Sequence, residues 1–241
     1  YIHDGNLGKV KLARGLCYKR RASIGKVDGP QPIPKGIDYD LWCGPARMEP
    51  LMGKELHYDW HWVWPTGNGD VGNQGIHQMD IARWILQEDA LSPAVLSVGG
   101  RIGYIDDGTT PNTQIVVHGY ERAPLIFEVR GLPAHKESRE MGKYRGASIG
   151  VIVDWEEGYM VIPTYDSAIV YDKEGKEVKK FKGGANHYEN FVKAVRSRKH
   201  TDLNADILEG HLSSALCHTG NVSHRLGAHR SPEEIREAIE G

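Results

Sequence analysis

The chain has 241 residues, of which 39% are hydrophobic and 26% are charged, and its formal net charge at pH 7 is −2. This length allows one large domain or two small ones, and the balanced charge argues against nucleic-acid binding, which usually requires a basic excess. No apolar run approaches the roughly 18 residues of a membrane-spanning helix. We therefore expect a soluble protein with no membrane partner, in either the cytoplasm or the periplasm.

The first half of the sequence contains few regular elements. A strand is predicted for residues 9–18, followed by a long irregular connection over residues 25–50, which hold five of the 12 prolines. The aromatic alternation in residues 56–64 (LHYDWHWVW) predicts a second strand, with three tryptophans on one face. Residues 70–87 have the best helical pattern in this half.

The second half begins with a block of strands. The predicted strands are 94–104, 113–120, 124–131 and 147–154, followed by a hairpin at 159–171 and a turn at 172–176. The predicted helices are 187–198, 203–226 and 232–240. Because the strands come together instead of alternating with helices, the sequence predicts an α+β fold with a mostly antiparallel sheet.

Neither a dinucleotide site nor a metal site is indicated. The glycine-rich residues 97–103 lack the G-x-G-x-x-G spacing, and a strand follows them where a dinucleotide-binding unit would have a helix. The three cysteines lie far apart without a C-x-x-C pair, so no disulfide framework or cysteine zinc site is expected. We expect this chain alone to bind no cofactor and no metal.

The densest polar cluster lies in residues 66–84 (TGNGDVGNQGIHQMDIARW). At about 100° per residue, one helical stripe contains Asp70, Asn73, His77 and Trp84, with Asp80 at its edge. A histidine with an ordinary pKa near 6.5 can accept or donate a proton at neutral pH, so His77 is a candidate catalytic group. The alternative is a structural His–Asp pair. A metal site is less favoured, because metal-binding helices more often place their ligands at i and i+4.

Two other features could contribute to a sugar-binding surface. Trp60, Trp62 and Trp64 could form an aromatic platform, although buried core aromatics are the alternative explanation. Arg20 and Arg21 could hold an anion or hydroxyl groups, although solvated surface arginines are equally consistent with the pattern.

Four stretches together carry a resemblance to a known family. They are the opening YIHDGNLGKV, the segment DYDLWCGPA at 38–46, the glycine-rich residues 67–80, and the run from HYENFVKAVRSRK to ALCHTGNVSHRLG. In combination they resemble the C-terminal domain of the Gfo/Idh/MocA oxidoreductases, the group of glucose–fructose oxidoreductase and inositol dehydrogenase. The resemblance covers nearly the whole chain.

The resemblance implies one substrate-binding and oligomerisation domain over residues 1–241, built as an open sheet with helices packed on one face. Residues 1–8 are then expected to end a linker helix from an N-terminal Rossmann domain that this chain lacks. That domain would bind NAD or NADP and would supply a catalytic lysine. The sheet would mediate homo-oligomers.

The resemblance also assigns site residues. His77 falls on the family's catalytic histidine and Asp80 on its trailing acidic residue. Asn73 stands where the family has a catalytic aspartate, and an amide cannot act as a general base. Asp70, one turn earlier, could supply the carboxylate instead. The remaining candidate substrate contacts are Trp62, Arg21 and His187.

In the implied reaction, a sugar or polyol hydroxyl gives its proton to His77, or to the lysine of the absent domain, as the substrate carbon reduces nicotinamide. Two alternatives stay open. The protein could be a redox-neutral member that cleaves a glycosidic bond with bound NAD, or a non-catalytic carbohydrate-binding or interaction domain. We expect the 241 residues alone to have no dehydrogenase activity.

Overall fold

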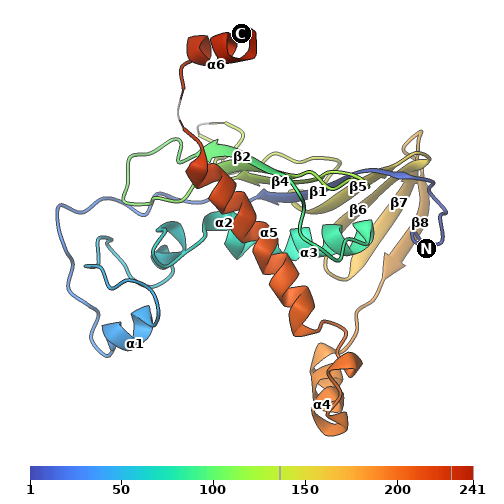
Figure 1. Cartoon of the computed structure of the whole chain (residues 1–241), viewed down its shortest axis with the longest axis horizontal. Helices are drawn as coiled ribbons and strands as arrows, with labels where there is room; N and C mark the ends of the chain where they lie inside the picture. The colour runs from blue at the N-terminus through green and yellow to red at the C-terminus, as the bar shows by residue number, and fades with distance from the viewer. Residues whose placement is uncertain (136, 229, 241) are drawn as a thin grey trace.

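The computed structural model describes residues 1–135, 137–228 and 230–240, of which residues 239 and 240 are described by their backbone alone. Within these ranges, eight strands form one open sheet (Figure 1). They are β1 (Val10–Tyr18), β2 (Val95–Gly100), β3 (Thr113–His118), β4 (Leu125–Arg130), β5 (Ile149–Trp155), β6 (Gly158–Thr164), β7 (Ser167–Asp172) and β8 (Glu177–Lys182). The strand order is β2-β3-β4-β1-β5-β6-β7-β8. Neighbouring strands are antiparallel except β1 and β4, which run parallel.

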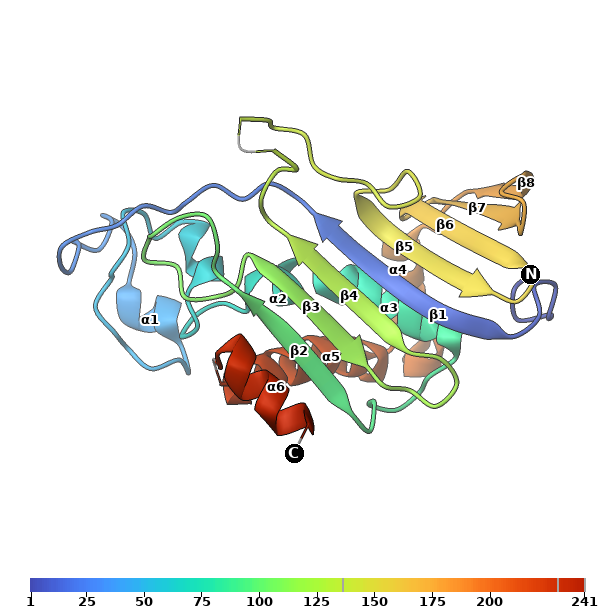
Figure 2. The same ribbon diagram turned by 90° about the horizontal axis from the view of Figure 1, so that it is seen from above.

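The helices fall into two groups. Those described are α1 (Tyr39–Cys43), α2 (Gly69–Asn73), α3 (Gly75–Leu86), α4 (His187–Ser197), α5 (Ile207–Leu226) and α6 (Pro232–Glu240), with 3-10 helices η1 (Asp59–Trp62) and η2 (His200–Asp202). α2, α3 and α5 pack on one face of the sheet, whereas α1, α4 and α6 project from the body (Figures 1 and 2). The prediction of an α+β fold with an open, mostly antiparallel sheet and helices packed on one face is confirmed.

Close packing against small residues fixes the position of α3. A Cβ atom on Gly15 of β1 would lie 2.9 Å from side-chain atoms of both Gln78 and Phe127, so only glycine lets α3 approach the central strand this closely. Gly220 does the same for α5 against Val116, where a Cβ would lie 2.8 Å from the valine side chain. The N-terminal end of α3 is therefore held against the middle of the sheet.

The opposite face of the sheet carries its own apolar cluster, formed by Leu16, Tyr18, Ala147, Ile152 and Val161. Beside it, Glu128 accepts hydrogen bonds from the Tyr18 hydroxyl at 2.6 Å and from Arg130 at 2.9 Å. Across β6 and β7, the rings of Tyr159 and Tyr171 stack at 4.8 Å. No helix packs on this face in the described part of the chain, so it is the more open side of the sheet.

Three local predictions are wrong. Residues 56–64 form no strand: Tyr58 has φ 69°, the chain turns into η1, and the Trp62 carbonyl accepts backbone N–H groups of Thr109 and Thr110 instead of those of a sheet neighbour. Residues 1–8 form consecutive turns, not the end of a helix, with Gly5 and Gly8 at positive φ. The predicted helix over 70–87 is two helices, α2 and α3, which meet at Gln74.

The last part of the chain follows its pattern more closely. β6 and β7 form the predicted hairpin at 159–171, and a turn joins β7 to β8. Asn186 caps α4 by accepting the Glu189 N–H at 3.2 Å. No helix in the described ranges combines the length and hydropathy needed to cross a bilayer.

Candidate active site

The polar cluster centres on a buried ion pair between the segment after β1 and the start of α2. Arg21 donates from Nε to Oδ2 of Asp70 at 2.9 Å and from Nη2 to Oδ1 at 2.6 Å. The side chains are 9% and 1% exposed, respectively. A bidentate contact of this kind fixes both groups in one geometry. Both carboxylate oxygens of Asp70 are therefore engaged within the protein.

Aromatic groups hold the guanidinium of Arg21 in place. Its Nη1 donates to the Tyr58 hydroxyl at 3.1 Å, and its Cζ lies 4.8 Å from the ring centre of the buried Trp62. Burial acts to lower the pKa of Arg21, but the hydrogen bonds and charge of Asp70 outweigh it and raise the pKa above its ordinary value. Arg21 and Asp70 therefore form a fixed unit of paired charges.

Asn73, the last residue of α2, extends this unit. Its Nδ2 donates to Oδ1 of Asp70 at 3.3 Å, which sets the orientation of the amide. Its side-chain carbonyl oxygen has no hydrogen-bond partner among the residues that the structure describes. An oriented amide with an open acceptor can bind a hydroxyl group.

His77 lies one turn further on, at the exposed start of α3. Its ring packs edge-on against Tyr165 with 5.6 Å between the ring centres, and neither ring nitrogen makes a hydrogen bond within the described ranges. The Tyr165 hydroxyl accepts a hydrogen bond from Gln74 Nε2 at 3.0 Å. These contacts orient the imidazole and leave its nitrogens accessible to a ligand.

A groove runs beside this histidine, between α3 and the β5–β6 strands. It has a volume of about 260 Å³, and its polar lining includes Gln74, Gln78 and Tyr165. Apolar side chains such as Ile162 line the remainder. His77 does not line the groove, but its ring packs against Tyr165, which does. An open imidazole near such a groove can take part in proton transfer with a small hydroxyl-bearing ligand.

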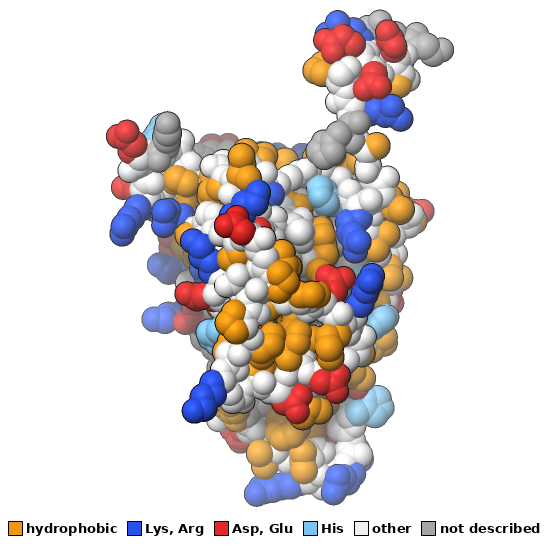
Figure 3. Space-filling model, turned by 90° about the vertical axis from the view of Figure 1, so that its left-hand side faces the viewer, with side chains coloured by type: hydrophobic (Ala, Val, Ile, Leu, Met, Phe, Trp, Pro, Cys, Tyr) orange, Lys and Arg blue, Asp and Glu red, His pale blue; other side chains and the backbone are white. Residues whose placement is uncertain are grey.

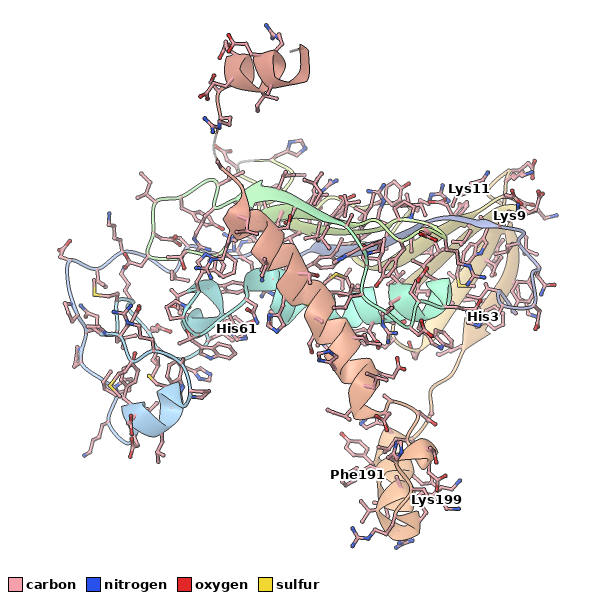
Figure 4. All side chains as sticks on the ribbon, viewed as in Figure 1. His3, Lys9, Lys11, His61, Phe191 and Lys199 are labelled. Carbon is pink, nitrogen blue, oxygen red and sulfur yellow. The ribbon has the colours of Figure 1, made fainter. Side chains whose placement is uncertain are left out.

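The structure does not bring all the predicted residues together. The carboxylate of Asp80 accepts a hydrogen bond from the Ser213 hydroxyl at 2.5 Å and also contacts Arg83 at 3.4 Å, which places it between α3 and α5. His187 begins α4, and its ring lies 4.1 Å from that of Tyr188. α4, which carries the labelled Phe191, projects away from α3 and from the sheet (Figure 4).

Two residues of this cluster have no signal in the sequence. Tyr58 reaches Arg21 only because η1 replaces the predicted strand, and Tyr165 comes from the turn between β6 and β7, 88 residues after His77. By contrast, Gln74 and Gln78 are spaced i, i+4 on the helical stripe next to His77, so the pattern could have identified them.

The described residues offer neither a metal cluster nor a dinucleotide cradle. No group of three or more His, Cys, Asp or Glu in these ranges could hold a metal ion. Gly99 and Gly100 lie in β2, which leads through a loop to β3 without an intervening helix. The glycine-rich stretch at β2 therefore does not form a dinucleotide cradle.

Comparison with known families identifies the fold. Residues 9–122 match the Gfo/Idh/MocA family described as "Oxidoreductase family, C-terminal alpha/beta domain". The resemblance to the Gfo/Idh/MocA oxidoreductases is confirmed. No curated protein sequence matches the chain.

Several solved structures share the fold of this chain at low sequence identity. A protein of Erwinia carotovora atroseptica assigned as an oxidoreductase has a TM-score of 0.61 at 13% identity and aligns with 92% of this chain and 58% of its own. One from Thermotoga maritima, also assigned as an oxidoreductase, has 0.59 at 16%, with 94% and 56% covered. The WlbA dehydrogenase of Bordetella pertussis, solved with NADH and UDP-GlcNAcA, has 0.56 at 15%, with 94% and 56% covered. The chain thus spans less than two thirds of each of these proteins.

Proposed function

We propose that this Gfo/Idh/MocA domain is the substrate-binding portion of an NAD- or NADP-dependent oxidoreductase that acts on a sugar or polyol hydroxyl. The observation that carries the proposal is the open imidazole of His77, which follows the oriented amide of Asn73 by four residues, at the junction of α2 and α3. The complex of WlbA with NADH and UDP-GlcNAcA supports the substrate class.

In this proposal the residues have separate roles. His77 takes or gives the proton of the reacting hydroxyl, and Asn73 hydrogen-bonds a neighbouring hydroxyl. Asp70 is almost fully buried and both its oxygens are occupied, so it is a positioning residue that holds Asn73 and Arg21. Trp62 packs its ring against the guanidinium of Arg21.

Asp80 and His187 have different parts in this arrangement. Asp80 fixes α3 against α5 through Ser213, which sets the direction of the helix that carries His77. His187 lies on the projecting α4 and takes no part in the proposed proton transfer. It would meet a substrate only if another part of the protein closed over α4.

The proposal assigns the cofactor to an N-terminal Rossmann domain outside this chain, because the glycine-rich stretch at β2 does not form a dinucleotide cradle. No step through the cofactor is assigned to this chain. We also propose that the open face of the sheet, with its Tyr159–Tyr171 stack, mediates a homo-oligomer.

The test is His77→Ala in the protein that joins this domain to its cofactor domain. We expect kcat/KM with sugars or polyols to fall by about 10² to 10⁴, the usual contribution of a positioned acid–base group, while NADH binding measured by fluorescence is unchanged. His211→Ala, at an exposed position on α5, is the matched control and should leave both quantities unchanged.

Other outcomes separate the alternatives. Unchanged turnover in His77→Ala would contradict the catalytic role and favour a non-catalytic carbohydrate-binding domain. Release of an aglycone without net NADH would favour the redox-neutral glycoside-cleaving interpretation, for which the amide at Asn73 is the motivating feature. Reduction of NAD by the 241 residues alone would contradict the assignment of the cofactor to another domain.

A further inference from the structure

A second cavity lies in the arm formed by α1, η1 and the loops between them, at the end of the molecule seen in Figure 3. Its volume is about 230 Å³, and its lining includes none of the residues of the His77 site. Apolar side chains gather at this end between charged ones (Figure 3). The cavity is therefore a separate candidate for ligand binding, of a size that suits a small molecule.

Aromatic rings form part of its wall. Tyr39 and Trp42 of α1 stack with 5.7 Å between ring centres and an angle of 8° between their planes. Trp60 of η1 also lines the cavity and stacks on His61 at 3.6 Å. The face of an aromatic ring attracts a cation, and tryptophan does so most strongly.

The charged lining is predominantly acidic. Four carboxylates line the cavity against one guanidinium, and they are Glu49, Glu55, Asp59 and Asp107. The guanidinium is that of Arg47, which is 86% exposed and lies 3.8 Å from Glu49. The charge of Arg101 acts to lower the pKa of Asp59, but Arg101 is already paired with Asp106, to which its Nη2 donates at 2.6 Å.

Two of these carboxylates, those of the exposed Glu55 and the half-buried Asp59, make no ion pair with a described residue. The Asp107 carboxylate accepts the Val27 N–H at 2.8 Å, but Asp59 and Glu55 make no hydrogen bond or ion pair with any described residue. Burial, and then the charge of Glu55, raise the pKa of Asp59. Two neighbouring carboxylates of like charge are stabilised by a positive ligand between or beside them.

The kind of cation follows from the spacing of the acids. No three of the described His, Cys, Asp or Glu residues converge closely enough to hold a metal ion. A neutral ligand would not offset the charge of the four carboxylates that line the cavity. We propose that this cavity binds a small organic ammonium ion, with its charged head beside Asp59 and Glu55 and its alkyl groups against the Trp60 and Trp42 rings. The proposal does not depend on the oxidoreductase function.

The probe is choline chloride, and its control is 3,3-dimethyl-1-butanol, which has the same shape without the charge. Isothermal titration calorimetry on the 241-residue chain is expected to show choline binding at least tenfold more tightly than the alcohol. Raising the salt concentration from 50 to 500 mM should weaken choline binding and leave the alcohol unaffected.

A matched pair of variants locates the site. Asp59→Asn should weaken choline binding at least threefold and should fold, because the carboxylate that it replaces makes no hydrogen bond within the described ranges. Asp40→Asn removes an exposed carboxylate of α1 that does not line the cavity and should leave the affinity unchanged. Circular dichroism verifies the fold of both variants. Equal affinity for the two probes, no choline binding up to 50 mM, or unchanged affinity in Asp59→Asn would overturn the proposal.

Discussion

His118 gives a quantitative test of how burial controls the stability of this fold. It is the last residue of β3, it pairs with Val95 and Leu125 in the neighbouring strands, and its side chain is 0% exposed. Neither ring nitrogen has a hydrogen-bond partner in the described structure. Burial lowers the pKa of His118 from 6.5 to about 4. The folded protein therefore keeps this imidazole neutral in conditions where the unfolded chain would protonate it.

The sign of the effect follows from the direction of the shift. Because the pKa is lower in the folded state, the contribution of His118 is fully present above pH 6.5 and is lost as the pH falls towards 4. Linkage between these two values gives a loss of about 2 kcal/mol between pH 7.5 and pH 5, and roughly 3 kcal/mol by pH 4. This is a large fraction of the stability of an ordinary domain.

The assay is urea denaturation at pH 7.5, 6.0 and 5.0 on the wild-type chain and on His118→Leu. We expect the wild type to lose about 2 kcal/mol more than the variant over this range, because leucine cannot be protonated. His211→Leu, at an exposed position on α5, should lose as much as the wild type. Equal losses in the wild type and His118→Leu would refute the argument that burial of this imidazole controls the acid sensitivity.

Three further changes test contacts around the site. Asp70→Asn leaves the buried Arg21 without its counter-charge and should cost about 3–5 kcal/mol, which lowers the Tm by roughly 6–20 °C in calorimetry. Gly67→Ala would place a Cβ 2.3 Å from a backbone carbonyl of η1, so we expect little folded protein by circular dichroism. Ser213→Ala removes the hydroxyl that bonds Asp80 and should cost about 1 kcal/mol in urea denaturation.

Each of these predictions has its own contradicting result. Replacement of both partners, Arg21→Met with Asp70→Leu, should recover much of the stability lost in Asp70→Asn, and failure to recover it would argue against an unpaired charge as the cause. A fully folded Gly67→Ala would show that η1 can shift. A loss above 3 kcal/mol in Ser213→Ala would point to a larger rearrangement between α3 and α5.

The strand block was predictable because its signals are local. The alternation in β3 gives that strand its buried face, β5 is an apolar run that is buried almost throughout, and the Asp172–Lys176 segment marks the turn before β8. The parallel pairing of β1 with β4 was not predictable, since residues 112 apart in the sequence are joined, as in the pair Ala13 and Leu125. No local pattern encodes a partner at that separation.

In the candidate site, too, local contacts were predictable and long-range contacts were not. Asp70, Asn73 and His77 lie close in the sequence, so helical spacing was enough to group them. The bond from Arg21 to Asp70 spans 49 residues, and it changes the meaning of Asp70 from an available base to a buried partner. The strand prediction for residues 56–64 was wrong because alternating tryptophans are typical of strands. In the structure Trp62 is buried against the guanidinium of Arg21 instead.

The central place of β1 has a consequence for synthesis on the ribosome. β1 comes first in chain order among the strands of this sheet, yet it joins the β2–β4 half of the sheet to the β5–β8 half. Its contacts with β5, such as Gly15 with Val151, require about 136 further residues. At about 5–20 residues per second, that is roughly 7 to 27 s after β1 is made. Until β4 is made both edges of β1 are unpaired, and the edge that pairs with β5 stays unpaired for the whole interval, so chaperone binding to β1 would protect the nascent chain from aggregation.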